Sequence, residues 1–203
     1  MGYAGICAPN TQSSGEDYFH NKSYNQIQTF VETTTATWIN PNVSYDVNST
    51  ETDANLYDWV DVSSTGTEIT GLSDDNVVGP YAIGFDFPFF GIVYTEFYVQ
   101  SNGLISFDDG SGVSICSTAN GQIPSVDGCD NMIAWMWDDL YPRVFSNVYY
   151  QLIDGDKLVI QFVNYGEYAS ESGRVNAEVI FKKNGDIVFQ YLDFKNEMEL
   201  TSS

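Results

Sequence analysis

Short apolar runs separated by clusters of turn residues dominate the second half of this 203-residue chain, and they limit the folds open to it. In the run 174–182, apolar residues occupy every second position, as in a half-buried strand. Asn184-Gly185 follows, and this pair between alternating runs indicates a hairpin. The strands expected from this pattern are 81–87, 94–100, 103–107, 132–137, 147–153, 157–164, 174–182 and 186–192. No window shows a helical stripe, so we predict an all-β chain that forms an antiparallel β-sandwich.

The first 55 residues lack this pattern. They are rich in Ser, Thr and Asn, and their β-prone stretches are short, at 28–31 and 35–39. We therefore divide the chain into an extended polar N-terminal arm, 1–55, and a β-sandwich domain, 56–203. A strand in the arm can complete the sheet edge of a neighbouring copy and so support assembly. Alternatively, the arm packs on its own sandwich or serves as a linker.

The charge of the chain excludes several classes of partner and reaction. It has 28 acidic and 7 basic residues, a formal net charge of −21, which repels nucleic-acid phosphates and anionic membranes. No apolar run approaches the roughly 20 residues of a membrane-spanning helix. The single histidine, His20, lies in the polar arm, and no pair of acids is singled out for acid–base catalysis. We expect no enzyme activity.

The cysteines and the N-glycosylation sequons indicate where the protein is located relative to the cell. Cys116 and Cys129 flank a loop rich in Gly, Asn, Asp and Ser, and we favour a disulfide that closes it. Two small buried thiols are the alternative, and Cys7 is left odd in either case. Sequons for N-glycosylation occur at Asn21, Asn42 and Asn48. Together with sparse lysine, the expected disulfide places the chain outside the cell or on its surface.

Three pairs of aspartates are candidate Ca²⁺ ligands, because carboxylates at strand ends and turns supply the oxygen donors that this ion prefers. The candidates are Asp74, Asp75, Asp108, Asp109, Asp138 and Asp139. Alternatively, these carboxylates cap turns. Alternation places Trp135 and Trp137 on one face of their strand, where the indole rings would be candidate ligand contacts.

Several segments of the second half resemble a known extracellular domain. They include Phe85-Asp-Phe-Pro-Phe-Phe-Gly91, Tyr98-Val-Gln-Ser-Asn-Gly-Leu-Ile-Ser-Phe107, Ile133-Ala-Trp-Met-Trp-Asp-Asp-Leu140 and Val148-Tyr-Tyr150. This pattern is similar to the nidogen-like (NIDO) domain of plexin-domain-containing receptors and bacterial secreted multidomain proteins, over roughly 56–194. The resemblance implies an extracellular β-sandwich for adhesion, matrix contact or attachment. It implies no catalytic set.

These observations lead to two hypotheses about function. The first is a non-catalytic extracellular structural or adhesion module that binds an extracellular protein or glycan, or copies of itself through the arm. The alternative is a Ca²⁺-dependent carbohydrate-binding module, in which aromatic faces stack on sugars while Asp and Asn oxygens orient the hydroxyls. Apart from Ca²⁺, we expect no cofactor.

Overall fold

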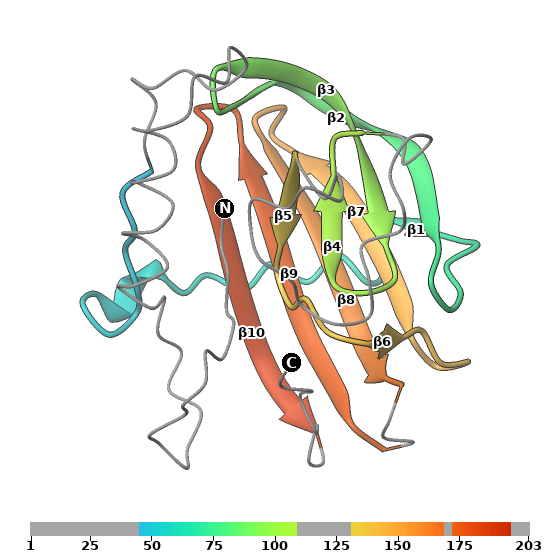
Figure 1. Cartoon of the computed structure of the whole chain (residues 1–203). Coiled ribbons are helices and arrows are strands. Elements are labelled where there is room, and N and C mark those ends of the chain that lie inside the picture. The colour runs from blue at the N-terminus through green and yellow to red at the C-terminus, as the bar shows by residue number, and fades with distance from the viewer. Residues whose placement is uncertain (1–44, 109–130, 169–171, 196–203) are drawn as a thin grey trace, which may run out of the picture.

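The computed structural model describes residues 45–108, 131–168 and 172–195, and within these ranges the chain is built from strands (Figure 1). Apart from them, one 3₁₀ turn occurs, η1 (Ala54–Leu56). The prediction of an all-β chain is confirmed. Among the described residues there is no helix long and apolar enough to span a membrane.

Two antiparallel sheets pack face to face. The six-stranded sheet has the order β1-β7-β8-β9-β10, and β6 pairs with the end of β8. Its strands are β1 (Thr67–Ile69), β6 (Leu140–Tyr141), β7 (Asn147–Ile153), β8 (Lys157–Glu167), β9 (Arg174–Lys182) and β10 (Ile187–Lys195). The four-stranded sheet has the order β2-β3-β4-β5. Its strands are β2 (Val77–Phe89), β3 (Ile92–Gln100), β4 (Leu104–Ser106) and β5 (Met132–Ala134).

The eight strands expected from the sequence all form, although three of the long strands, β2, β8 and β10, extend beyond the expected bounds. The sequence did not predict β1 and β6, which have three and two residues and are too short to show a period. The strand expected at 132–137 ends at Ala134. It ends there because the next two backbone N–H groups, of Trp135 and Met136, both donate to the carbonyl of Gly103. This early stop positions the residues of the candidate site.

Aromatic side chains fill the space between the sheets. Phe87 of β2 stacks on Phe181 of β9 with ring centroids 4.7 Å apart, and Trp135 stacks on Phe162 of β8 at 4.1 Å. Each of these side chains is almost fully buried. A buried side chain of this size stabilises the fold by roughly 1.5–3 kcal/mol. These contacts hold the two sheets together and keep the loops at their ends in fixed positions.

A segment between η1 and β1, which we call the strap (residues 58–62), crosses the outer face of the six-stranded sheet (Figure 1). Alternate backbone N–H groups of the strap donate to side chains on three adjacent strands. The pairs are Asp58 to Gln190 at 2.6 Å, Val60 to Glu178 at 3.2 Å and Val62 to Gln161 at 2.8 Å. The three acceptors are register partners across β8, β9 and β10, so they form one row under the strap.

The described part of the arm contacts the sandwich. Tyr45 packs against Phe89 and Phe90 at the turn between β2 and β3, with ring centroids 6.3 and 5.2 Å away. Burial raises the pKa of the Tyr45 hydroxyl to about 12. The division of the chain between residues 55 and 56 stays a prediction.

Candidate functional site

Three loops converge at one end of the sandwich, and hydrogen bonds fix the first two against each other. Asn76 and Ser101 exchange two bonds: the N–H of Ser101 donates to the carbonyl of Asn76, and the N–H of Asn76 donates to Oγ of Ser101, both at 3.0 Å. The Asn76 side chain also closes its own loop, since its Nδ2 donates to the carbonyl of Gly71. This holds Asp74 and Asp75 beside the turn that joins β3 to β4.

The third loop follows β5. The carbonyl of Gly103 accepts the N–H groups of Trp135 at 3.1 Å and Met136 at 3.2 Å, which turns the chain away from the sheet. Asp138 and Asp139 come next, directly before β6. The N–H of Asp139 donates to Oδ1 of Asp138 at 2.8 Å, and Asp138 is buried. The fold therefore brings Asp139 to the loop that carries Asp74 and Asp75.

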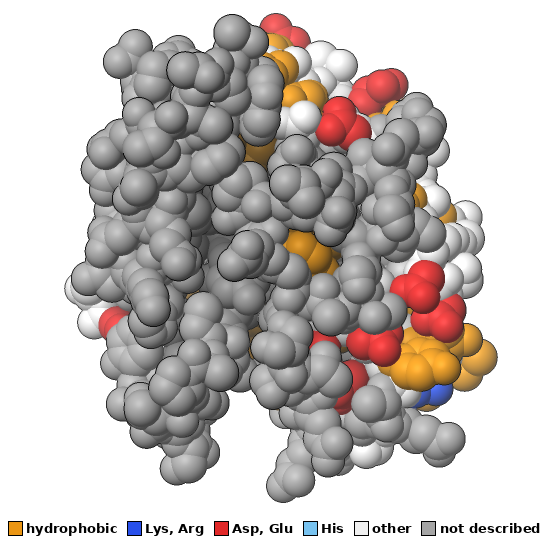
Figure 2. All heavy atoms as spheres, in the orientation of Figure 1, with side chains coloured by type: hydrophobic (Ala, Val, Ile, Leu, Met, Phe, Trp, Pro, Cys, Tyr) orange, Lys and Arg blue, Asp and Glu red, His pale blue; other side chains and the backbone are white. Residues whose placement is uncertain are grey.

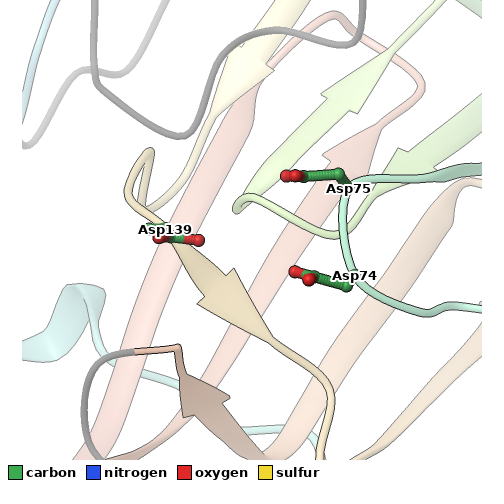
Figure 3. A group of neighbouring side chains, drawn as sticks. All are labelled: Asp74, Asp75 and Asp139. Atoms are coloured by element: carbon green, nitrogen blue, oxygen red, sulfur yellow. The ribbon is translucent and has the colours of Figure 1, made fainter.

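The carboxylates of Asp74, Asp75 and Asp139 form an acidic cluster. One oxygen from each lies within 4.8 Å of the others, and Figure 3 shows the three side chains directed toward one another. Partial burial raises the pKa of the Asp139 carboxyl above its usual value, and repulsion from Asp75, Asp74 and Asp138 raises it further. Oxygen donors gathered in this way suit a hard cation.

Asn102 lies directly behind the acidic cluster. Its side chain is fully buried, and its Nδ2 donates to Oδ1 of Asp75 at 2.9 Å. Its Oδ1, on the same amide, is buried and has no hydrogen-bond partner among the described residues. Buried polar atoms are nearly always paired, and Gln100 Oε1 and Trp135 Nε1 are further exceptions among the described residues.

An exposed aromatic surface continues from the acidic cluster. We call it the β6 patch: the exposed Val144, Phe145 and Tyr168 with the half-buried Tyr141 and Arg143, supported by the buried Arg174 against the ring of Phe145. The N–H of Tyr168 donates to the carbonyl of Asp139 at 2.9 Å, which joins the patch to the cluster. Near the position of β6, Figure 2 shows acidic side chains next to hydrophobic and basic ones.

Arginines order the rings of the β6 patch. The guanidinium of Arg174 lies 4.1 Å from the ring centre of Phe145, and that of Arg143 lies 4.8 Å from the ring centre of Tyr141. Arg143 Nη2 also donates to the carbonyls of Glu167 and Tyr168, each at 3.0 Å. The sequence analysis missed this surface. The available signal was the run Tyr141-Pro-Arg-Val-Phe145, which breaks the alternation between two strands.

Residues 44–203 match the model of the NIDO-related family, which covers more than half of the chain. The chain belongs to this family. The resemblance drawn from the sequence is therefore confirmed. Members of the NIDO-related family are usually extracellular. No curated protein and no solved structure matches this chain.

The NIDO-related fold separates the six aspartates expected to bind Ca²⁺. Asp74, Asp75 and Asp139 meet, whereas Asp138 is buried and bonds to the backbone of its neighbour. Asp108 lies elsewhere and accepts a hydrogen bond from Nδ2 of Asn131 at 3.0 Å. Asp109 lies outside the described residues.

The structure corrects the expectation that two indole rings offer a surface to a ligand. Trp135 is 1% and Trp137 is 6% exposed, so both belong to the interior. The physical reason is that β5 ends before them and the chain turns inward, where Trp135 stacks on Phe162. The sugar-binding hypothesis thus loses these two indole rings as stacking surfaces, and otherwise stays a prediction.

The remaining predicted sites concern modification. Cys116, Cys129, Asn21 and Asn42 lie outside the described residues, and the disulfide and these sequons stay predictions. Asn48 is described and exposed, as a glycosylated asparagine must be. Its glycosylation also stays a prediction.

Proposed function

We propose that this chain is a non-catalytic extracellular attachment module that binds a protein partner through the β6 patch. The observation that carries the proposal is the exposure of apolar side chains there: Val144 is 101%, Tyr168 54% and Phe145 46% exposed. The family, whose members are usually extracellular, supports the location.

The composition of the β6 patch is that of a protein-binding surface. Tyr, Phe and Arg are enriched at protein interfaces, and Tyr and Arg are frequent among the residues that dominate binding energy. The cation–π contacts at 4.1 and 4.8 Å hold two rings before any partner arrives. A surface ordered in advance loses less side-chain entropy on binding. The net charge of −21 disfavours polyanionic partners, so an extracellular protein fits better.

A charge placed in the β6 patch is expected to weaken attachment strongly. Val144→Asp should weaken binding of the purified chain to cells or secreted matrix of its source by at least about tenfold, because a carboxylate would lose water among apolar contacts. Val144 is fully exposed, so the fold should not change. Retention of labelled chain on the cell surface, before and after protease treatment of that surface, measures the effect.

Val93→Asp is the matched control. Val93 is also a valine with an exposed side chain, at 58%. It lies on β3, near the opposite end of the sandwich (Figure 1). It should bind as the unmodified chain does. Equal loss in the two variants, or binding that survives protease but not glycosidase treatment, would exclude a protein partner at this patch.

We also propose that the arm links copies of the chain. Its supports are the β-prone stretches at 28–31 and 35–39, the odd Cys7, and the edge that β10 presents. Among the described strands, β10 pairs with β9 alone, and it exposes Leu192 and Phe194. A long edge with apolar side chains can accept an added strand.

Removal of residues 1–44 is expected to reduce the oligomeric state. A chain that begins at Tyr45 keeps the contact of this ring with Phe89 and Phe90, so the sandwich itself should be preserved. Light scattering and electron microscopy of both chains at high concentration measure assembly. If the full chain is monomeric under oxidising conditions, the arm does not link copies.

A further inference from the structure

We propose that the strap is a pH-sensitive cover: ionisation of Glu178 releases residues 58–62 from the outer face of the six-stranded sheet, while the sandwich stays folded. The strap crosses β8, β9 and β10 as one extended segment (Figure 1). Each of the three strands holds it through one side chain, and Glu178 is the middle one of the three. Release of the strap is independent of the attachment proposed above, because it needs no partner.

Glu178 is the one ionisable side chain in the row that holds the strap. Both oxygens of its carboxyl accept the N–H of Val60 at 3.2 Å, and Oε2 also accepts Nε2 of Gln190 at 3.0 Å. The side chain is 1% exposed, so these two neutral donors replace the water that a carboxylate would bind. A buried charge is costly unless an opposite charge pairs with it. The seat under the strap therefore favours the neutral carboxyl.

The charged groups around Glu178 leave it without an ion pair. Among the described residues, no basic nitrogen lies within 4.0 Å of its carboxyl. The strap itself carries two acids, Asp58 and Asp61, and the charge of Asp61 opposes ionisation of Glu178. The charge of Lys157, on β8, acts in the opposite direction. Burial, and then the charge of Glu178, raise the pKa of the Tyr57 hydroxyl above 10, so this group stays neutral.

The strap can leave the sheet without disturbing the main core. Its apolar contacts belong to a small cluster on the outer face, in which Val62 is buried with Val159 and Ile180 and Val60 packs against them. This cluster is separate from the core between the sheets. Upstream of the strap, η1 buries no residue. A segment held by few buried contacts opens at a lower free energy than the whole domain.

Opening of the strap and ionisation of Glu178 are coupled. Burial under the strap raises the pKa of this carboxyl to about 7, and contact with water in the open form returns it to the ordinary 4.5. Between these values the closed form binds more protons, so the closed form is favoured fully below the lower pH and loses this advantage as pH rises to the upper one. Neutral pH would thus uncover Val159 and Ile180, which are 0% and 4% exposed under the strap.

Hydrogen exchange of the full chain at about pH 5 and about pH 7.5, in up to about 1 M urea, tests this cover. The protection factor of each amide relates its rate to that of an unprotected amide at the same pH. We expect Val60 and Val62 to exchange faster than Val179 of β9 and independently of urea, and their protection to fall at least about tenfold at the higher pH. Strap amides that match Val179 in protection and in urea dependence would overturn the proposal, because the strap would then leave only on global unfolding.

Variants assign the pH effect to Glu178. Glu178→Gln keeps the size and the acceptor oxygen but cannot ionise, so its strap amides should have the same protection at both pH values. Glu68→Gln, at an exposed position of β1, is the matched control and should keep the pH effect. A pH effect that persists in Glu178→Gln, or is lost in Glu68→Gln, would overturn the assignment.

Val62→Ala keeps the proposal testable if Glu178→Gln fails to fold. It weakens the small apolar cluster and leaves the carboxyl in place. The strap amides should therefore exchange faster at both pH values, with an unchanged ratio between them. Loss of the pH effect in Val62→Ala would contradict control of the strap by Glu178.

Discussion

Gly103→Ala is expected to prevent formation of the native fold, with a loss of more than about 4 kcal/mol in the free energy of unfolding. A Cβ built on Gly103 would lie 1.8 Å from the carbonyl oxygen of Met136 and 2.5 Å from its carbon. Both are backbone atoms, so no side-chain rotation relieves the clash. Domains of this size have only about 5–15 kcal/mol of stability in total, so little native protein should remain. Near-UV circular dichroism and urea unfolding measure the loss.

Gly155→Ala is the control that separates the clash from backbone strain. Gly155 has nearly the same left-handed backbone, with φ of +77° against +75° for Gly103, but nothing lies within 4 Å of its Cβ position. Its substitution should reduce stability by about 1–2 kcal/mol, the usual penalty of this conformation for a residue with a side chain. If both variants lose the same amount, the close approach of Gly103 to Met136 is not what requires glycine.

The turn at Gly103 can be predicted from the sequence, but its contact with a distant segment cannot. Asn102-Gly103 is a residue pair typical of turns, because these residues favour a left-handed backbone. The partner of that turn, the segment that begins at Trp135, is more than thirty residues away along the chain. No local pattern encodes that contact. For the same reason alternation predicted Trp135 on a strand face, whereas the Gly103 carbonyl ends the strand before it.

The sequence predicted that aspartates from different loops would come together, but not which of them would do so. The sequence analysis named three pairs of aspartates as candidate Ca²⁺ ligands. The structure brings both members of one pair, Asp74 and Asp75, close to Asp139 of a second pair. Among 28 acidic residues, sequence cannot decide which loops meet, because loop positions follow from sheet order. The unpartnered side-chain oxygen of Asn102 was hidden for another reason. A buried oxygen without a partner is a property of packing, and no residue type reveals it.

A second large effect on stability is expected from Glu178, which lies on the outer face of the six-stranded sheet. Alternation correctly placed Glu178 opposite the core-facing residues of β9, yet it is only 1% exposed because the strap covers it. Removal from water is the main cause that raises the pKa of the Glu178 carboxyl to about 7, and the charge of Asp61 raises it further. Hydrogen bonds from Val60 and Gln190 and the charge of Lys157 act in the opposite direction.

This raised pKa predicts that stability falls as pH increases. In the unfolded chain the carboxyl has its ordinary pKa of 4.5, so between 4.5 and about 7 the folded state binds more protons. Its contribution is fully present below the lower value and is lost as pH rises to the upper one, by up to about 3 kcal/mol. Glu178→Gln imitates the protonated form. It should therefore be more stable than the unmodified chain at about pH 8 and lose this advantage at about pH 5.

The comparison of the two chains at each pH isolates Glu178 from the other acidic groups, which change the stability of both equally. Urea unfolding at several pH values gives the difference, and Glu68→Gln on the exposed part of β1 is the control, whose stability should follow that of the unmodified chain. A difference between Glu178→Gln and the unmodified chain that does not vary with pH would mean that the strap leaves this carboxylate hydrated. The three-strand row of Gln161, Glu178 and Gln190 would then hold the strap by hydrogen bonds alone, without an ionisable group that weakens it near neutral pH.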